Sequence, residues 1–449
     1  MSERLLSVGL DVGTTSTQLV VSELQIENRA SSFAVPELEI SNRTIRYKGK
    51  VHFTPLLGES LVDGDGVRAI VEEEYRKAGI QRQDVNTGAI IITGETSRKE
   101  NAKAVLSALS DFAGDFVVAT AGPDLESVLA AKGAGADVFS AETGKTVLHM
   151  DIGGGTSNLA LIRDGKIVET GCLNVGGRLL KFDKTGVVTY VSPVLAGLCS
   201  LKVGDRASEA QVEEMAETLV QALEMAAGLR EPTDLPERLW TRECGPVWTS
   251  APAGVVISFS GGVADCIEKD LPWLEFGDMG PILGKTIRNS RLCRGEYRLG
   301  SETIRATVIG AGCHSAQLSG STVFCQNVSL PLKNLPVVRI ESADRETIRR
   351  EFARQEGLAV LALPGISAPS YREIRAMAEE IAVMAEPILV CLEQDMAKAL
   401  GQALAVKLGP TARILCIDRV KLGQESFLDV GNPIGPALPV VVKTLVLGR

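Results

Sequence analysis

Two stretches of the chain carry the same alternation of apolar and polar positions. Residues 8–21 read VGLDVGTTSTQLVV and residues 148–161 read LHMDIGGGTSNLAL, and the two align without a gap. Each is an apolar run, a turn of small polar residues that opens with Asp-x-Gly, and a second apolar run. This pattern predicts two β-hairpins with an aspartate at each turn. The repetition predicts two related domains that face one ligand.

Further apolar runs, expected to be strands, alternate along the chain with segments of helical periodicity. This alternation is typical of an α/β fold. Before the second hairpin the expected strands are 4–10, 17–24, 89–93 and 116–120, and the expected helices are 65–77, 98–110 and 124–131. Residues 132–145 are small and polar, and we expect them to form an irregular crossing between domains.

The same alternation continues to the C-terminus. The expected strands are 157–163, 166–173, 254–259, 303–309, 337–340, 358–363, 413–417 and 437–447. The expected helices are 208–226, 263–269, 344–355, 370–383 and 388–408, and residues 229–253 are expected to be irregular. We predict three regions: residues 1–140, residues 141–325 and a C-terminal α/β region over 326–449.

Composition excludes several classes of protein. The 449 residues are 45% apolar and 23% charged, which is ordinary for a globular protein with a sizeable core. A net charge of −9 argues against a nucleic-acid partner, and the apolar runs are too short to span a membrane. Nine cysteines without close spacing favour reduced thiols. The expected location is the cytoplasm, with association with a bacterial microcompartment left open.

The two turns place a carboxylate beside glycine at a strand end, Asp11 in the first copy and Asp151 in the second. Mg²⁺ typically binds one or two carboxylates, several waters and phosphate oxygens. We therefore expect the two aspartates to hold one Mg²⁺ ion between opposite walls and to take part in catalysis. A single Asp-x-Gly turn is usually only a turn, and the matched pair is what favours a site.

Small residues follow each aspartate and predict a polyphosphate gripped from both sides. Glycines let backbone N–H groups approach phosphate oxygens, and hydroxyls add donors. The predicted phosphate-binding residues are Gly13, Thr14, Thr15, Ser16, Gly153, Gly154, Gly155 and Thr156. A third piece is Ser260-Gly261-Gly262, where a buried strand opens into a helix and offers a flat backbone surface for adenine or ribose.

The order of these pieces resembles the superfamily of actin, heat-shock chaperones and sugar kinases. The match runs over residues 5–320: two phosphate hairpins, a first connecting helix, the Ser-Gly-Gly segment for adenosine, and Gly310-Ala311-Gly312 for the second connection. The resemblance implies two ribonuclease-H-like, actin-like domains around a nucleotide cleft with ATP and Mg²⁺. The α/β C-terminal region is additional to them.

Within that superfamily the chain is similar to the ethanolamine ammonia-lyase reactivating factors. The similar segments are 10–18 (LDVGTTSTQ), 92–96 (ITGET), 149–155 (HMDIGGG), 257–262 (ISFSGG) and 438–444 (LPVVVKT). This resemblance implies a chaperone-like ATPase that releases damaged cobalamin from ethanolamine ammonia-lyase, so that intact adenosylcobalamin can enter. The partner is then that cobalamin-dependent lyase, with cobalamin as an indirect partner through it, and whether the chain binds cobalamin directly is left open.

One departure concerns hydrolysis. Heat-shock chaperones carry a water-positioning glutamate near the start of the first connecting helix, where this chain has Gly122. We therefore expect slow ATP hydrolysis, or another carboxylate in that role: Glu95 first and Asp124 second. For both, a helix cap or a solvated first-turn charge is an equally good interpretation.

The other ionisable residues are weaker candidates for the functional site. Alternation places His149 on the same face as Asp151, although such a histidine is more often a core residue. Cys313 and His314 are adjacent, which disfavours a nucleophile–base pair. The acidic stretch 209–224 is most simply a solvated helix face, with docking of a partner as the alternative.

Two other functions remain open from the residues alone. A small-molecule kinase of the same fold would need a base carboxylate aimed at a substrate hydroxyl. A non-enzymatic nucleotide-binding module would keep the turns without turnover.

Overall fold

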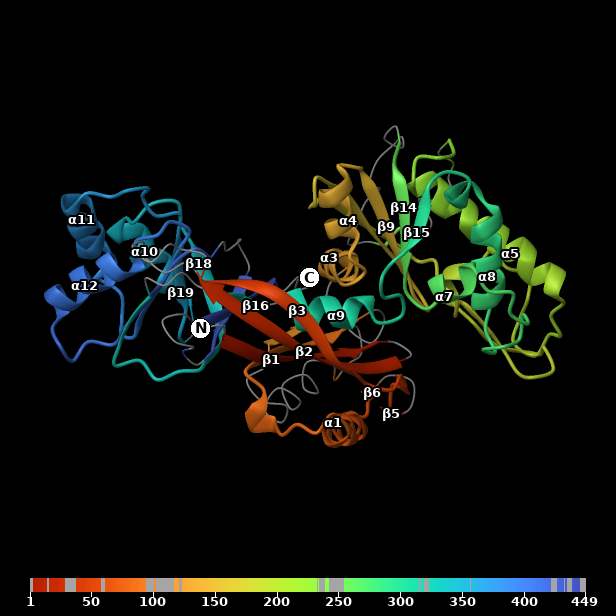
Figure 1. Ribbon diagram of the computed structural model, residues 1–449, viewed down its shortest axis with the longest axis horizontal. Coiled ribbons are helices and arrows are strands. Elements are labelled where there is room, and N and C mark those ends of the chain that lie inside the picture. The colour runs from red at the N-terminus through yellow and green to blue at the C-terminus, as the bar shows by residue number, and fades with distance from the viewer. Residues whose placement is uncertain are drawn as a thin grey trace.

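The computed structural model describes most of the chain. The described residues are 3–13, 16–28, 38–57, 61–93, 101, 117–120, 123–231, 233, 239–241, 254–314, 316–318, 323–355, 357–420, 426–431, 433 and 438–444. Figure 1 shows an elongated molecule with the C-terminal region at one end, the first sheet in the middle and the second sheet at the other end. No helix in these ranges is long and apolar enough to cross a bilayer.

The first part of the chain forms a sheet whose central strands are joined by the first Asp-x-Gly turn. In spatial order its strands are β3 (Leu38–Lys48), β2 (Ser16–Asn28), β1 (Glu3–Val12), β7 (Thr87–Ile92) and β8 (Val117–Thr120), with β4 (His52–Phe53) beside β2. The first three strands are antiparallel, and β7 and β8 continue parallel to β1. Apolar residues are buried on both faces, as expected for central strands.

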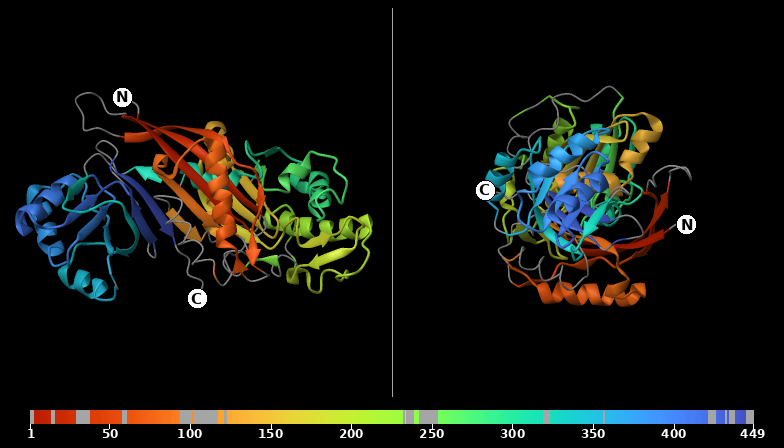
Figure 2. Two further views of the ribbon diagram at one scale, coloured as in Figure 1. Left: turned by 90° about the horizontal axis from the view of Figure 1, so that it is seen from below. Right: turned by 90° about the vertical axis from the view of Figure 1, so that its left-hand side faces the viewer.

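Helix α1 (Gly64–Ala78) covers one face of this sheet, as the left view of Figure 2 shows. The Asp63 side chain caps its N-terminus by accepting a hydrogen bond from the backbone of Gly66. Gly79, at φ 67°, ends it in the left-handed conformation that glycine adopts without strain. A short hairpin, β5 (Leu56–Leu57) and β6 (Leu61–Val62), precedes the helix.

The second sheet repeats the strand order of the first. Its strands are β11 (Lys166–Leu173), β10 (Ser157–Arg163), β9 (Val147–Ile152), β14 (Val256–Ser260) and β15 (Tyr297–Leu299). The first three are antiparallel, and β14 and β15 are parallel to β9 and to each other. Two sheets with the same order and directions confirm the actin-like fold class expected from the sequence.

One large core joins the second sheet to the elements around it. These elements are β12 (Leu180–Phe182), β13 (Val188–Val191), α5 (Glu209–Ala226), α7 (Ala264–Ile267) and α8 (Gly280–Asn289). The expectation that α5 is a purely solvated acidic face was wrong at one residue. Glu224 is buried, where it pairs with Arg230 and accepts a hydrogen bond from the backbone of Arg291.

Two helices cross between the sheets. Helix α3 (Pro123–Gly133) packs on β9, β10 and β11, and α9 (Ala306–His314) packs on β1, β2 and β7. They touch through glycine: a Cβ on Gly133 would lie 1.8 Å from the carbonyl oxygen of Ala306. Each helix thus packs on the sheet of the other predicted region.

The C-terminal region has its own eight-stranded sheet, at the end of the long axis seen in Figure 2. In spatial order the strands are β16 (Ala316–Leu318), β23 (Pro439–Thr444), β22 (Ser426–Val430), β18 (Leu332–Arg339), β19 (Val360–Leu363), β20 (Ile388–Leu392), β21 (Ile414–Ile417) and β17 (Phe324–Gln326). Helices α10 (Arg345–Phe352), α11 (Tyr371–Ile381) and α12 (Ala397–Leu408) pack on the β18–β21 part.

Three elements predicted from the sequence were wrong, and a fourth is shorter than predicted. Residues 303–309 are not a strand, because α9 starts at Ala306 and its small residues fit between α3 and the first sheet. The predicted helix 388–408 begins instead with buried β20, since a short apolar run does not distinguish a strand from a helix. Residues 132–145 contain α4 (Ala136–Thr143), and the predicted helix 263–269 shortens to α7. Apart from Asn101, the predicted helix 98–110 lies outside the described ranges.

Candidate functional site

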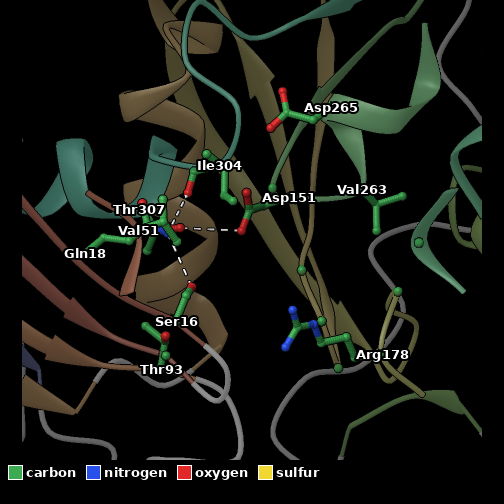
Figure 3. A pocket seen from close by; sticks show the side chains of 18 of the residues that line it. Ser16, Gln18, Val51, Thr93, Asp151, Arg178, Val263, Asp265, Ile304 and Thr307 are labelled. Carbon is green, nitrogen blue, oxygen red and sulfur yellow. Dashed lines mark hydrogen bonds between the residues drawn. The ribbon is translucent and has the colours of Figure 1, made fainter. Parts of the chain in front are cut away.

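The two Asp-x-Gly turns line one cavity of about 360 Å³ between the two sheets. Both sheets contribute to its walls, together with α3, α9 and the loop that follows β11 (Figure 3). Asp11, Gly13 and Ser16 come from the first turn, and Asp151 and residues 153–156 come from the second. The matched pair of turns therefore faces a single space.

The two turns share the same backbone geometry. Gly13 N–H donates to the carbonyl of Ser16 over 2.9 Å, and Gly153 N–H donates to the carbonyl of Thr156 over 2.9 Å. In each hairpin the aspartate lies opposite an amide side chain in the strand register. These amides are Gln18 and Asn158, so the repeat seen in the sequence extends to the pairing of side chains across the strands.

Asp11 is buried and held by one hydrogen bond. The hydroxyl of Thr93, just beyond the end of β7, donates to its Oδ1 over 2.9 Å. Burial raises the pKa of Asp11 to about 7, although the Thr93 hydrogen bond lowers it and the charge of Asp151 raises it further. The effect of the Asp151 charge on the pKa of Asp11 agrees with the placement of both carboxylates in one cavity.

Asp151 is buried and receives hydrogen bonds from both sides of the cleft. The hydroxyl of Ser260, opposite Asp151 on β14, donates to Oδ1, and the hydroxyl of Thr307 on α9 donates to Oδ2 over 3.4 Å. Burial raises the pKa of Asp151 to about 6, against the lowering effect of these two hydroxyls. Helix α9 therefore brings the first sheet into contact with the aspartate of the second.

His149 lies behind Asp151 and is fully buried. Its Nδ1 is 3.1 Å from the hydroxyl of Ser258 and its Nε2 is 2.9 Å from the hydroxyl of Ser260. Burial lowers the pKa of His149 to about 3, so the ring is neutral near pH 7. His149 therefore touches the site only through Ser260.

Two buried amide oxygens beside the aspartates have no hydrogen-bond partner among the described residues. They are Oε1 of Gln18 and Oδ1 of Asn158, whereas Nε2 of Gln18 donates to the carbonyl of Ile304 over 3.1 Å. An unpaired buried acceptor is costly and is usually satisfied by water or an ion. Of these two residues Gln18 lines the cavity, and its unpaired oxygen beside two ionisable carboxylates fits a hydrated cation between the turns.

Glycines bring backbone close to the second turn. A Cβ on Gly176 would lie 2.4 Å from the carbonyl oxygen of Gly154, and a Cβ on Gly261 would lie 2.3 Å from that of Ile152. Gly261 has φ 85°, which further favours glycine. Gly261 and Gly262 line the cavity beside Val263, so a flat backbone wall is present where the adenosine segment was expected.

The family model of the ethanolamine utilisation protein EutA matches residues 3–448. The chain belongs to the EutA family.

Two EutA relatives match over their whole lengths. The ethanolamine ammonia-lyase reactivase EutA of Salmonella typhimurium is 37% identical over 471 residues, covering 99% of each chain. The protein of the same name from Escherichia coli K12 is 37% identical over 468 residues, again covering 99% of each. A solved Ppx/GppA family member of Aquifex aeolicus is 12% identical, covers 69% of this chain and 97% of its own, and has a TM-score of 0.42. The actin-like fold of this EutA-family chain is assigned from its strand order.

The structure brings together most of the predicted site residues of this EutA-family chain. Asp11, Gly13, Ser16, Asp151, Gly153, Gly154, Gly155, Thr156, Gly261 and Gly262 all line the cavity. Ser260 does not line it and instead supports Asp151 from behind. Thr14, Thr15 and Glu95 lie outside the described residues. Asp124 accepts a hydrogen bond from Thr170 and is not among the lining residues, and Cys313 is buried beside Ser22.

Sequence reasoning missed several lining residues: Gln18, Phe53, Thr93, Glu126, Arg178, Asp265, Asp278 and Thr307. Most come from the connecting helices or from loops far from either motif, so spacing gives no signal for them. Gln18 is an exception, because its match to Asn158 is visible in the repeat. Arg178 also had a local signal, since it directly follows Gly176-Gly177.

Proposed function

We propose that this EutA-family chain is an ATP-dependent, chaperone-like reactivase of ethanolamine ammonia-lyase. In this proposal it releases damaged cobalamin from the lyase, so that intact adenosylcobalamin can enter. The relatives with which it shares 37% identity over 99% of its length are named reactivases of that enzyme. The observation that carries the nucleotide part is the placement of Asp11 and Asp151, from matched turns, in one cavity.

The cavity has the chemistry for a nucleotide polyphosphate with a divalent cation. Within the described residues no three His, Cys, Asp or Glu side chains form a metal site, so two carboxylates and phosphate oxygens would have to share the ion. Asp11 and Asp151 would hold Mg²⁺ in this way. When bound, the ion neutralises phosphate charge and polarises the phosphate that is transferred.

The protein groups around the aspartates orient them. Thr93 fixes Asp11, and Ser260 and Thr307 fix Asp151, so both carboxylates are positioned before a ligand enters. Gly13 and residues 153–155 leave room for phosphate oxygens to approach the backbone. Because Thr307 lies on α9, packed on the first sheet, the position of Asp151 is coupled to the relation between the two sheets. Closure around ATP is the conformational change that we propose the lyase detects.

Hydrolysis needs a group that orients the attacking water. Glu95 remains our first candidate for this role. Glu126, on the first connecting helix, is a second, because it lines the cavity whereas Asp124 does not. With Gly122 at the position of the chaperone glutamate, we propose that turnover is slow.

A reconstitution experiment tests this function. Ethanolamine ammonia-lyase inactivated with cyanocobalamin is mixed with the purified chain, ATP, Mg²⁺ and free adenosylcobalamin, and recovery of lyase activity is followed. Recovery should require the chain and ATP together, and should be lost with Asp151→Asn. A chain that binds ATP but restores no activity would contradict the reactivase role. ADP formation that depends on a small alcohol, without the lyase, would favour a kinase instead.

A further inference from the structure

The cavity is strongly acidic, and one cationic side chain stands out in its wall. The described lining residues include five carboxylates, of Asp11, Glu126, Asp151, Asp265 and Asp278. Against these, the lining includes one arginine, Arg178, and no lysine among the described residues. A polyphosphate entering this space would meet repulsion from most of the ionised groups. Among the described lining residues, Arg178 is the one whose positive charge is permanent.

The backbone of Arg178 is fixed to the second phosphate turn. Gly177 N–H donates to the carbonyl of Gly153 over 3.0 Å, and Arg178 N–H donates to the carbonyl of Gly154 over 2.7 Å. Gly176 lies so close to Gly154 that a Cβ would clash with it. The loop and the turn therefore form one unit, and Arg178 keeps a constant position relative to residues 153–155.

The side chain of Arg178 is oriented but only partly engaged. Its Nε donates to Oδ2 of Asp278 over 3.1 Å, and Asp278 is itself held by the backbone N–H of Gly280 over 2.9 Å. The Nη1 and Nη2 atoms of Arg178 donate to no residue in the described part of the chain. In Figure 3 the guanidinium extends from the second sheet toward the side of the cavity formed by Ser16 and Thr93. Four N–H donors thus remain available to a ligand.

The side of the cavity formed by the first sheet, which we call the opposite half, supplies a partner for the same guanidinium. Phe53, on β4 beside the first phosphate turn, has its ring centroid 5.9 Å from Cζ of Arg178. Phe53 is 78% exposed, which is unusual for a large apolar residue in a cleft wall. A guanidinium over a ring gains a modest cation–π attraction that grows as water is excluded.

We propose that Arg178 binds a phosphate group of the nucleotide and clamps it by stacking on Phe53 of the opposite half. This inference rests on the proposed nucleotide-binding function and adds a residue to it. A guanidinium is permanently charged, and its planar donors match two phosphate oxygens. Asp278 holds the side chain extended before the ligand arrives, and Phe53 covers it when the halves approach. The clamp therefore couples phosphate binding to closure.

Calorimetric titration of ATP and of ADP, each with Mg²⁺, tests the clamp on the full chain. Replacing Arg178 by Met should weaken both nucleotides by about tenfold or more, as expected for charged hydrogen bonds. The matched control is Arg163→Met, which removes one charge from an exposed position on the same half and should change affinity less than about twofold. An Arg178→Met variant that binds both nucleotides like the control would overturn the proposal.

A second variant separates ligand binding from a structural role. If Arg178 only neutralises the buried Asp278, then Asp278→Asn should restore nucleotide affinity to the Arg178→Met variant. The clamp predicts that the double variant stays weak, and restored affinity would overturn it. Failure of the unmodified chain to bind either nucleotide would instead contradict the proposed function itself.

Phe53→Leu tests the contribution of the opposite half. It should weaken ATP binding about threefold in the unmodified chain and have no effect in the Arg178→Met background, because the two side chains act together. Equal losses in both backgrounds would show that Phe53 does not act through Arg178, and would remove the clamp from the proposal.

Discussion

The ring of His149 and the carboxylate of Asp151 are joined through a single hydroxyl, that of Ser260. Because Ser260 donates its proton to Asp151, it must accept one from Nε2 of His149, 2.9 Å away. The neutral ring then accepts at Nδ1 from the hydroxyl of Ser258, 3.1 Å away. All donors in this buried chain point toward Asp151, which favours its charged form.

Removing Ser260 should make Asp151 harder to ionise. The Ser260 hydroxyl lowers a pKa that burial has raised to about 6, so Ser260→Ala should raise it further. A cation binds the carboxylate, not the acid, so the pH at which Mg²⁺–ATP affinity reaches half its maximum should move up by about one unit. Calorimetric titration between pH 5.5 and 8.5 measures this midpoint.

Ser258→Ala, at the far end of the same chain, is the control. It leaves the hydroxyl on Asp151 in place and should move the midpoint much less. Equal midpoints in Ser260→Ala and the unmodified chain would show that this hydrogen bond does not govern ionisation of Asp151.

Asp11 should make the ligand-free protein less stable as the pH rises. Its pKa is raised to about 7 in the folded state from an ordinary value of 3.8, so the stability it contributes is present below pH 4 and lost as the pH rises through 7. Asp11→Asn removes this titration, and at pH 8 it should be more stable than the unmodified chain by roughly 4 kcal/mol, because the folded and unfolded pKa values differ by about three units. Urea unfolding in EDTA at pH 5 and 8 measures the difference.

Asp164→Asn is a matched control for Asp11→Asn. Asp164 lies in the β10–β11 turn at φ 49°, a conformation that asparagine also adopts. Asp164→Asn should therefore show the same difference in stability between pH 5 and pH 8 as the unmodified chain. If the unmodified chain and Asp11→Asn lose stability in parallel between pH 5 and 8, Asp11 is not the group that titrates there.

The crossing of α3 and α9 should not tolerate a single added methyl group. A Cβ on Gly310 would lie 2.0 Å from the carbonyl oxygen of Leu129, which is backbone and cannot move aside. Gly310→Ala should therefore lower the free energy of unfolding by about 2 kcal/mol or more. Gly295→Ala, where no atom lies within 4 Å, should stay within about 0.5 kcal/mol. Equal melting curves for the two variants would contradict this packing.

The loop of residues 49–55, which includes the short strand β4 and carries Phe53, should depend on a buried carboxylate for its position. Glu74 on α1 is fully buried and accepts hydrogen bonds from Tyr47, the backbone of Lys50, His52 and Lys77. Burial alone would raise its pKa, but these hydrogen bonds lower it to about 2.

Glu74→Gln should destabilise the folded chain by about 2 kcal/mol and weaken ATP binding severalfold, because the loop loses its anchor. Glu73→Gln is the control, because Glu73 is half-exposed on the same helix and pairs only at the surface, with Lys77. Full stability in the Glu74 variant would show that the loop is held elsewhere.

The sequence predicted the parts of the molecule that depend on local pattern. Apolar runs broken by Asp-x-Gly defined both hairpins, and their repetition predicted the shared cavity lined by Asp11 and Asp151. Contacts that form only through tertiary packing could not be predicted from the sequence. The residues of α9 were predicted to form a strand because Thr307, Val308 and Ile309 are β-branched, whereas the crossing with α3 favours a helix. Ser260 is in register with Asp151 only because β14 pairs with β9, and Arg178 reaches the cavity from a loop.

Electron paramagnetic resonance of Mn²⁺ titrated into the chain with ATP tests the central claim most directly. We predict one Mn²⁺ bound per chain only when ATP is present, and loss of that ion in both Asp11→Asn and Asp151→Asn. Retention of the ion in either variant would show that the two turns do not share one nucleotide-bound cation, and would contradict this account.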